Sequence, residues 1–258
     1  MKLGLIVFDL DGTLTETKRP MDAEMAGLLR RLLWEKKVAV IGGGSRETFQ
    51  HQFVDKIGKT GNLRNLSLFP TNATTFYRYR GGWKKVYRQE LPLKDKRRIK
   101  EAFRLVLGEL RYVPPKKTYG EIIEDRGTQI TFSALGQDVV AVLGKKGVRL
   151  KEAWTKKNTP LKLKIAKLVQ RHLPEFEVHA AGFTSIDVTR KGIDKAYGIR
   201  QIEKYLKIPK EEMVFIGDAL FPGGNDYAVK KTGVAVMMTS GPEETKKIIR
   251  KIIKKGRT

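Results

Sequence analysis

An apolar run near the start of the chain, LGLIVF at 3–8, ends in two carboxylates, Asp9 and Asp11. Side chains alternate along a strand with a period of two, so both carboxylates start on the same side, where the chain turns at Gly12. Like charges held that close repel, and such a pair needs a cation or a bound proton. A plain turn capped by an aspartate would explain Asp11 but not Asp9. The run therefore predicts a buried strand that ends in a functional site.

The segments that follow predict a parallel sheet. Residues 22–36 have the apolar spacing of a helix, with Asp22 as its cap, and 37–45 form a second apolar run that ends in GGGS. A strand, a helix and a strand in succession indicate a parallel unit. Ligands bind beyond the carboxyl ends of parallel strands. We therefore expect three strand-end residues to converge in one crevice, namely Asp9, Ser45 and Asp218.

A long separation between two of the polar strand ends predicts an inserted domain. Ser45 and Lys195 are 150 residues apart (195 − 45), whereas one strand–helix–strand unit takes about 30. We expect a core made of 1–82 and 187–258 and an insertion at 83–186. The fold class expected is α/β, a Rossmann-like parallel-sheet core that carries an inserted α+β domain.

The net charge is +24, from 52 Lys and Arg against 28 Asp and Glu, and it suggests a polyanion or a phosphate compound as partner. The most basic stretch, FYRYRGGWKKVYRQ at 76–89, resembles either a β-hairpin with one wet face or a platform for single-stranded nucleic acid. We favour the hairpin because the aromatic and basic residues alternate around a Gly-Gly turn. We therefore expect no nucleic-acid partner despite the charge.

The ligand types present in the sequence limit the metals that it can bind. There is no cysteine, and the three histidines leave little material for a histidine cluster, so a metal here should be hard and bound by oxygen. The apolar run before Asp9 is too short for a signal sequence, and no stretch of 18 apolar residues occurs. We expect a cytoplasmic protein without a membrane partner.

A second acidic motif, FIGDALFPGGNDYAV, places Asp218 after a strand and Asp226 eight residues later. The glycines between them let the backbone fold tightly enough to bring both carboxylates to one ion, although such a motif can also be an ordinary turn. Mg²⁺ takes few protein carboxylates together with phosphate oxygens. We expect it to bind Asp9, Asp218 and Asp226, with the backbone carbonyl of Asp11.

Four motifs together resemble those of the haloacid dehalogenase superfamily of phosphotransferases: FDLDGTLT, GGGS, Lys195 and GDALFPGGND, in the same order and spacing. The insertion resembles the larger α/β cap called type IIB. More narrowly, FPGGND, SIDVTRKGIDKAYGI and RGTQITFSALGQ are similar to segments of the eukaryotic-type phosphomannomutases. The resemblance covers nearly all of the chain and implies a phosphotransferase core with a substrate-specifying cap.

The resemblance also implies roles for the core residues. Asp9 would attack phosphorus and form an aspartyl-phosphate, and Asp11 would act as general acid and base. Ser45 and Lys195 would hold the phosphoryl oxygens, a task that Mg²⁺ shares. The alternatives are a helix N-cap for Ser45 and one solvated lysine among many for Lys195. Lys18 is expected to contact the substrate.

In the cap, the match to the phosphomannomutases is incomplete. Arg126 matches an arginine that grips a sugar phosphate, although it could also be an edge cation of a hairpin, and Ser185 and Asp187 match a Ser-x-Asp pair. Gln137 stands where a second arginine is expected, and Gly144 where a third is. An amide lacks the charge and the bidentate geometry of a guanidinium, although the cations at 145, 146 and 149 could replace it.

Three functions follow in order of preference. The missing arginines favour a magnesium-dependent phosphatase that acts on a sugar phosphate through an aspartyl-phosphate. The alternative is a phosphomannomutase that interconverts mannose 6-phosphate and mannose 1-phosphate. The third is a basic nucleic-acid-binding protein on an inactive scaffold, which the intact set of acids argues against. Oligomers could form through the cap.

Overall fold

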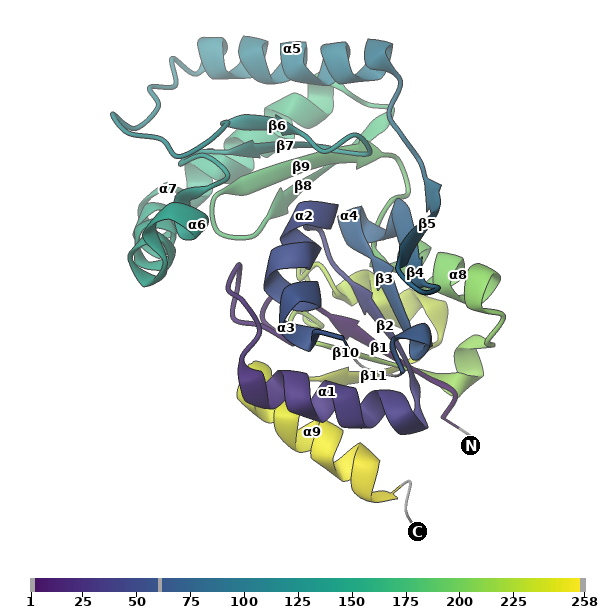
Figure 1. Cartoon of the computed structure of the whole chain (residues 1–258). Helices are drawn as coiled ribbons and strands as arrows, with labels where there is room; N and C mark the ends of the chain where they lie inside the picture. Colours follow the sequence, from purple (N-terminus) through teal and green to yellow (C-terminus); the bar gives the residue numbers. More distant parts are fainter. Residues whose placement is uncertain (1–2, 60–61, 256–258) are drawn as a thin grey trace. The chain divides into compact units, whose positions relative to one another are not determined.

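The computed structural model describes residues 3–59 and 62–255 (Figure 1). The chain divides into two compact units. Unit 1 contains the chain up to Arg88 and from Asp194 onward, and unit 2 contains Gln89–Ile193. Each unit has a sheet of its own.

Both boundaries of the insertion lie later than 83 and 186, where we expected them. The strand Trp83–Arg88 (β5) pairs antiparallel with Thr75–Tyr79 (β4), which keeps it in the sheet of unit 1. The strand Ser185–Arg190 (β9) pairs with a neighbour on each side in the sheet of unit 2. In both places the pairing of a whole strand, and not the position of a motif, fixes the boundary.

In the described residues, unit 1 has a seven-stranded sheet of order β11-β10-β1-β2-β3-β4-β5. The strands from β11 to β3 are parallel, and the hairpin β4–β5 is added antiparallel to β3. The five parallel strands are Leu5–Asp9 (β1), Lys37–Ile41 (β2), Leu66–Phe69 (β3), Met213–Gly217 (β10) and Ala235–Met238 (β11). This sheet confirms the expected α/β class.

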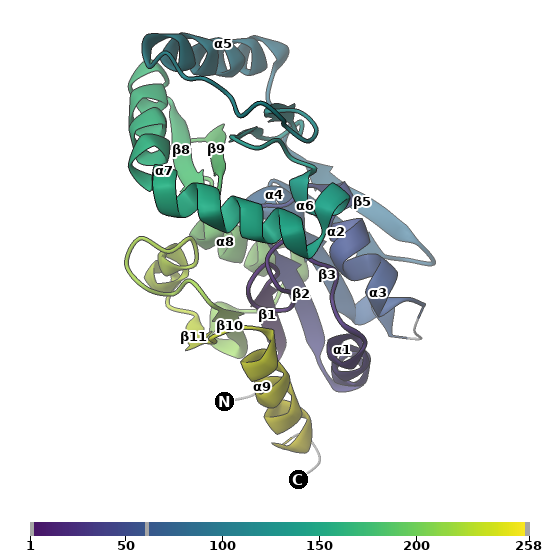
Figure 2. The same cartoon turned by 90° about the vertical axis from the view of Figure 1, so that its left-hand side faces the viewer.

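The helical segments of unit 1 connect these strands. They are Ala23–Glu35 (α1), Arg46–Phe49 (α2), Gln50–Val54 (η1), Asp55–Ile57 (α3), Leu63–Asn65 (η2), Pro70–Ala73 (α4), Lys195–Leu206 (α8), Lys210–Glu212 (η3), Tyr227–Thr232 (η4) and Pro242–Lys255 (α9). Asp22 caps α1 as expected, since its Oδ1 accepts a hydrogen bond from Met25 N at 2.8 Å. Helices α1 and α9 lie side by side (Figures 1 and 2).

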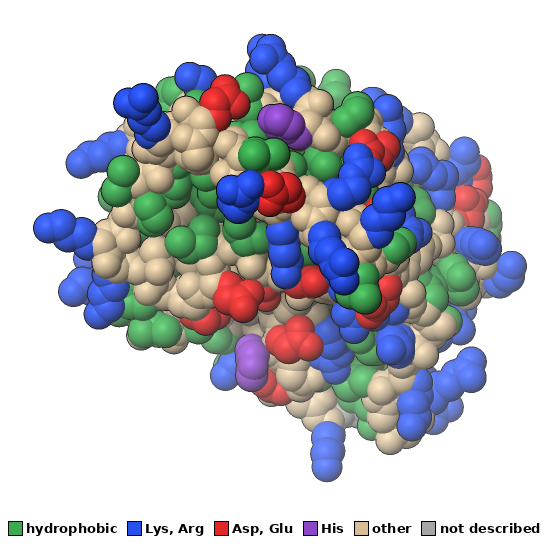
Figure 3. Space-filling model, turned by 90° about the horizontal axis from the view of Figure 1, so that it is seen from above, with side chains coloured by type: hydrophobic (Ala, Val, Ile, Leu, Met, Phe, Trp, Pro, Cys, Tyr) green, Lys and Arg blue, Asp and Glu red, His purple; other side chains and the backbone are tan. Residues whose placement is uncertain are grey.

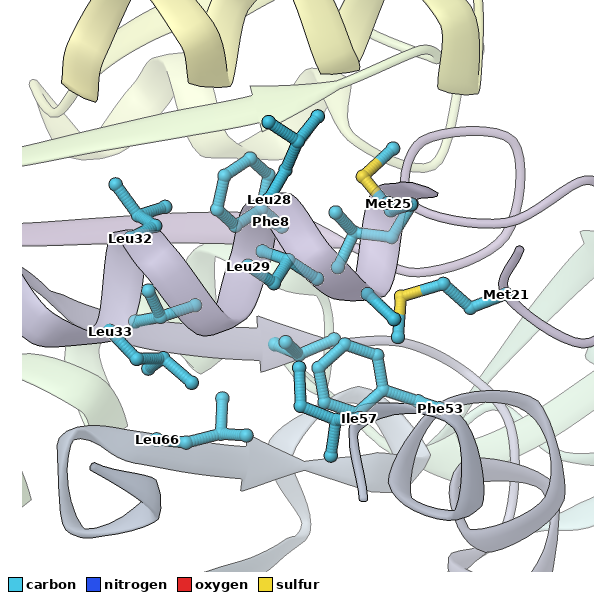
Figure 4. Packing of buried hydrophobic residues seen from close by; sticks show 14 of the residues in the cluster. Phe8, Met21, Met25, Leu28, Leu29, Leu32, Leu33, Phe53, Ile57 and Leu66 are labelled. Carbon is cyan, nitrogen blue, oxygen red and sulfur yellow. The ribbon is translucent and has the colours of Figure 1, made fainter. Parts of the chain in front are cut away.

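Alternation along β1 explains why this strand is apolar throughout. Ile6 and Phe8 join one buried cluster, whereas Leu5 and Val7 join another on the opposite face of the sheet. Figure 4 shows Phe8 beside Leu28 and Leu29 of α1, and Phe53 beside Ile57 in the same cluster. Complete burial of such side chains contributes about 1.5–3 kcal/mol each. The strand is thereby held firmly up to its last residue, Asp9.

The basic stretch at 76–89 forms the expected hairpin, β4–β5. Tyr79 and Trp83 meet edge to face, with ring centroids 5.6 Å apart, and pack against the core. Both rings are therefore packed against the core of unit 1, which argues against a platform on which nucleic-acid bases would stack. Elsewhere on the molecule, Lys and Arg side chains are spread over the face shown in Figure 3, with Asp and Glu among them.

In the described residues, unit 2 has a four-stranded antiparallel sheet of order β6-β7-β9-β8. Its further elements are Leu93–Glu109 (α5), Ile123–Asp125 (β6), Ile130–Ser133 (β7), Val139–Leu143 (α6), Lys145–His172 (α7) and Phe176–Ala181 (β8). The α+β content agrees with the expected insertion. Helix α7, prominent in Figure 2, continues through Pro160. Among the helices of the described ranges, none is both long and apolar enough to cross a membrane.

Candidate active site

Three charged side chains meet at the carboxyl ends of β1 and β10. Asp9, the last residue of β1, is 3% exposed, and its Oδ1 accepts a hydrogen bond from Lys195 Nζ at 2.5 Å. Lys195 begins α8 and also pairs with Asp226. All three side chains are almost completely buried. The structure thus brings Lys195 to the strand-end aspartate, which rules out the solvated lysine.

The loop after β10 positions Asp226. Its Oδ2 accepts a hydrogen bond from Ala219 N at 3.1 Å, which closes the loop that begins with Asp218. Gly217 makes room for this carboxylate, because a Cβ atom there would lie 2.3 Å from Asp226 Oδ2. The glycine-rich loop therefore brings Asp226 back to the end of β10, as its sequence predicts.

Asp218 completes a group of three carboxylates. Oxygen atoms of Asp9, Asp218 and Asp226 all lie within 4.8 Å of one another. Thr13 Oγ1 donates a hydrogen bond to Asp218 Oδ1 at 3.1 Å. Gly12, at φ +85°, lets the first loop pass close to Asp218, since a Cβ atom there would lie 2.6 Å from Asp218 Oδ2. The two acidic motifs therefore meet at one place.

The charge balance of this group fits a divalent cation. In the described part of the chain, the three carboxylates share one ammonium group, that of Lys195. Burial raises the pKa of Asp9 well above its usual value, Lys195 opposes this shift, and Asp226 adds to it. Burial likewise raises the pKa of Asp218, and Asp226 contributes again. The donor set of carboxylate oxygens is the one that Mg²⁺ prefers.

Lys195 is charged in this arrangement. Burial by itself lowers the pKa of its ammonium group, but Asp226 and Asp9 raise it by more, and the net shift is upward. A buried ammonium group can stay charged when carboxylates surround it. Lys195 therefore supplies one fixed positive charge at the end of β1.

Asp11 lies in a different environment from Asp9. Its Oδ1 accepts a hydrogen bond from Lys18 N at 2.5 Å, and Gln52 Nε2 lies 3.5 Å from the same oxygen. Asp11 does not belong to the group of three carboxylates. Lys18, which we expected to contact substrate, meets Asp11 through its main chain, with φ at +58°. The two aspartates of the first motif thus have separate partners.

Ser45 caps a helix. Its Oγ accepts a hydrogen bond from Thr48 N at 3.2 Å and lies 3.3 Å from Thr48 Oγ1. The helix that it caps, α2, is short, and Ser45 is buried. A helix N-cap is the alternative role that the sequence analysis gave for Ser45. The hydroxyl of Ser45 can still donate a hydrogen bond, so its role as helix N-cap does not exclude contact with an anion.

The expected cap residues belong to unit 2, where Arg126 and Gln137 contact each other. Arg126 Nε donates to Glu124 Oε2 at 2.7 Å, and Arg126 Nη2 donates to Gln137 Oε1 at 3.1 Å. Gln137 Nε2 donates in turn to the carbonyl of Thr131 at 3.2 Å. Gln137 therefore holds Arg126 in place, a role that a second guanidinium could not take.

The other two cap residues lie on β9. Asp187 Oδ1 accepts a hydrogen bond from Thr131 Oγ1 at 2.7 Å, and Asp187 is paired with Thr131 across β7 and β9. Ser185, two positions earlier on β9, is directed to the same face of the sheet. Both side chains are buried. Arg126, Gln137 and Asp187 are thus linked through Thr131 in one network.

Sequence reasoning missed two residues of the site. Thr13 lies within the motif FDLDGTLT, so the motif itself was a signal for it. Gln52 gave no signal, because a glutamine in a helical stretch normally faces solvent. It is 5% exposed and directed to Asp11.

Comparisons with known proteins agree with this geometry. The family model of haloacid dehalogenase-like hydrolases matches residues 6–257. A phosphomannomutase of Encephalitozoon cuniculi is 25% identical over 254 residues, which cover 97% of this chain and 94% of that protein. One of Nicotiana benthamiana is 27% identical over 250 residues, which cover 95% and 93%.

Solved structures share the fold. Plasmodium falciparum IMP-nucleotidase with bound IMP has a TM-score of 0.69 at 16% identity, over 98% of this chain and 68% of that one. A trehalose-6-phosphate phosphatase related protein has a TM-score of 0.54 at 16% identity, over 98% and 99%. At these identities the likeness is one of fold alone, and it confirms the expected fold class.

Proposed function

Because this chain belongs to the haloacid dehalogenase-like hydrolases, and is therefore an enzyme of that family, we propose that it transfers the phosphoryl group of a sugar phosphate by way of Asp9. The observation that carries the proposal is the position of Asp9. It lies at the end of a fully buried strand, bonded to Lys195, with two further carboxylates beside it. A carboxylate held in this way can attack phosphorus.

The acceptor of the phosphoryl group distinguishes a mutase from a phosphatase. Relatives named phosphomannomutase match this chain over nearly its full length. They favour the mutase over the phosphatase that we preferred from the sequence. We therefore propose that a sugar hydroxyl is the main acceptor, and that the enzyme interconverts mannose 6-phosphate and mannose 1-phosphate.

A sugar-phosphate phosphatase is the second candidate, and Gln137 is the observation that favours it. Gln137 occupies the position of an expected arginine and bonds to Arg126, while Gly144 occupies that of another. A mutase must retain a bisphosphate while it turns round, which calls for several cations in the cap. With fewer cations in the cap, the bisphosphate would be retained less well, and water would more often accept the phosphoryl group.

In either reaction the bonds change in the same way. A carboxylate oxygen of Asp9 bonds to phosphorus, and the bond from phosphorus to the sugar oxygen breaks. Asp11 gives its proton to that leaving oxygen. In the second step a hydroxyl or water attacks the aspartyl-phosphate, its proton goes to Asp11, and Asp9 is released. Lys195 opposes the negative charge on the transferring group.

The proposed cofactor is Mg²⁺, held by Asp9, Asp218 and Asp226. When bound it supplies positive charge against the phosphoryl oxygens. Among the residues that the structure describes, the three carboxylates face one ammonium group, so the site has negative charge left to balance. The carbonyl of Asp11, which we expected as a further ligand, stays part of this proposal.

Two assays run side by side test the function. One follows conversion of mannose 6-phosphate to mannose 1-phosphate with a hexose bisphosphate activator and magnesium, and the other follows phosphate release. We expect many isomerisations for each phosphate released. Release without isomerisation would favour the phosphatase. The absence of both activities, over a panel of sugar phosphates, would refute the proposed function. Asp9→Asn is the inactive control.

A further inference from the structure

A buried amide lies against the proposed acid and base of the reaction. Gln52 is 5% exposed, and its Nε2 lies 3.5 Å from Asp11 Oδ1. Its Oε1 is buried and has no hydrogen-bond partner among the described residues. A buried polar atom without a partner lowers stability. A methionine or leucine here would avoid that cost, so the amide calls for an explanation beyond packing.

The backbone around Gln52 is unusual in a way that serves this contact. The apolar spacing of 46–58 predicts one continuous α-helix, but Gln50–Val54 forms a π-helical turn. The N–H of Asp55 there bonds to the carbonyl of Gln50, five residues back. The wider turn changes the directions of the side chains, and such turns often occur at functional sites. Gln52 thereby lies on the buried side together with Phe53.

Gln52 also holds the loop that carries Asp11. Its carbonyl accepts a hydrogen bond from Met21 N at 2.8 Å, at the end of that loop. Within the loop, Lys18 N donates to Asp11 Oδ1 at 2.5 Å, and Lys18 has the left-handed conformation that residues other than glycine seldom adopt. The loop is thus fixed at two points around one carboxylate.

Both donors meet the same oxygen of Asp11. Lys18 N and Gln52 Nε2 are both directed to Oδ1, whereas Oδ2 has no hydrogen bond to any residue of 3–59 or 62–255. An oxygen that accepts two hydrogen bonds is poorly placed to hold a proton for transfer. Oδ2 is therefore the oxygen that is left for the substrate.

We propose that Gln52 is a positioning residue, which orients the carboxyl group of Asp11 through Oδ1 so that Oδ2 exchanges the proton with the substrate oxygen. This inference rests on the proposed function. Gln52 itself touches neither the phosphoryl group nor the sugar in the proposal. It acts on the reaction through Asp11 alone, and this restriction makes it testable.

The test uses the dependence of the reaction on its leaving group. Gln52→Met keeps the volume of the side chain and removes the amide. We compare kcat/KM for a hexose 6-phosphate, whose leaving oxygen needs a proton, with that for 4-nitrophenyl phosphate, whose leaving oxygen does not. In Gln52→Met we expect kcat/KM for the hexose 6-phosphate to fall about ten- to a hundredfold. We expect kcat/KM for 4-nitrophenyl phosphate to change less than about threefold. An equal fall for both esters, or no fall, would overturn the inference.

Gln50→Met is the matched control. Gln50 is the same residue type in the same π-helical turn, but its Nε2 donates to Asp55 Oδ1 in an exposed contact. We expect both esters to react at wild-type rates. A selective loss on the hexose phosphate in this control would mean that the turn, and not the amide of Gln52, positions Asp11.

A double variant separates positioning from a general loss of structure. If Gln52 acts only through Asp11, adding Gln52→Met to Asp11→Asn costs nothing further on the hexose phosphate. An additional fall would contradict the inference. Thermal unfolding shows whether each variant is folded. Should Gln52→Met not fold, Gln52→Asn, whose shorter amide cannot reach Asp11, replaces it with the same expected selectivity.

The activity of the wild type distinguishes a failure of the positioning role of Gln52 from a failure of the proposed function. If the wild type cleaves both esters and Gln52→Met loses both equally, the positioning role is wrong and the proposed function stands. If the wild type reacts with neither these esters nor other sugar phosphates, the proposed function fails and the positioning role fails with it.

Discussion

The Nζ atom of Lys195 lies 2.5 Å from Oδ1 of Asp9, although 186 residues separate the two in the sequence. Lys195 also pairs with Asp226, so one ammonium group joins the end of β1 to the loop after β10. Buried charges of this kind are screened little by salt. The stability and the chemistry of the site therefore both depend on this lysine.

Removing the ammonium group of Lys195 should reduce both the stability of the protein and its activity. In Lys195→Met, the carboxylates remain buried without their cation, and we expect a loss of about 3–5 kcal/mol in the free energy of unfolding of the metal-free protein. Urea denaturation with a chelator present measures it. Magnesium should restore part of the loss. Lys204→Met, at an exposed position of the same helix, should cost less than about 1 kcal/mol. A similar loss in both variants would contradict the role of Lys195.

The nucleophile can be tested by a nearly isosteric change. Asp9→Asn should abolish turnover and leave the fold intact, because an amide oxygen does not attack phosphorus as a carboxylate does. Initial rates measure the loss of turnover, and circular dichroism shows whether the fold is intact. Asp55→Asn, an exposed aspartate of unit 1, should keep full activity. Turnover close to that of the wild type in Asp9→Asn would rule out the aspartyl-phosphate.

Metal removal should stop the reaction. Chelation should abolish turnover and added magnesium should restore it, whereas zinc should restore it least, since an oxygen-only donor set suits harder cations. Calorimetric titration should show that Asp218→Asn binds magnesium more weakly than the wild type. Full activity after exhaustive chelation, with no metal found by elemental analysis, would refute the metal site.

The contribution of Asp218 to the stability of the metal-free protein should fall as pH rises. Burial, together with Asp226, raises the pKa of Asp218 above its value in the unfolded chain. Between the two pKa values this carboxyl binds more protons in the folded state than in the unfolded state, so its contribution to the free energy of unfolding decreases with pH. The window opens near the ordinary carboxyl value of about 4 and closes above the raised pKa of Asp218.

Asp218→Asn isolates this contribution. Urea denaturation at several pH values, with a chelator present, should give a shallower decrease for the variant than for the wild type. With saturating magnesium the wild-type decrease should disappear, because the metal binds the deprotonated carboxylates. An equal or steeper decrease in the variant would show that the pKa of Asp218 is not raised.

The cap can be tested at Gln137. Gln137→Arg replaces the amide that accepts a hydrogen bond from Arg126 with a second guanidinium. Binding of a hexose bisphosphate should strengthen by about 1.5–3 kcal/mol, the contribution of a hydrogen bond to a charged group. Monophosphate turnover should change less. Gln137→Ala, which removes the amide without adding charge, is the control, and equal binding by both variants would show that charge at this position does not matter.

Arg126→Ala tests whether the cap grips the sugar phosphate. It should weaken binding of a sugar phosphate, because the guanidinium is lost, yet hardly affect 4-nitrophenyl phosphate, which needs only the residues around Asp9. Values of kcat/KM for the two substrates measure the contrast. Equal losses on both would mean that Arg126 acts on the fold of unit 2 and not on the substrate.

Local patterns in the sequence were enough for the central part of the site. The apolar run before Asp9 predicts a buried strand, and Asp22 predicts a helix cap; both are present. The glycines after Asp218 predict a tight loop that returns Asp226 to the strand end, and it does. Each of these features depends on residues close together in the chain, where periodicity and turn chemistry decide the conformation.

Tertiary structure decided the remainder. The assignment of β5 to unit 1 depends on strand pairing, and the contact of Gln52 with Asp11 depends on a π-helical turn that no residue pattern announces. That Gln137 accepts a hydrogen bond from Arg126 likewise depends on which atoms meet after folding. The sequence by itself determined which residues carry the proposed chemistry; packing of segments far apart in the chain determined which atoms face each other, because those contacts form only in the complete fold.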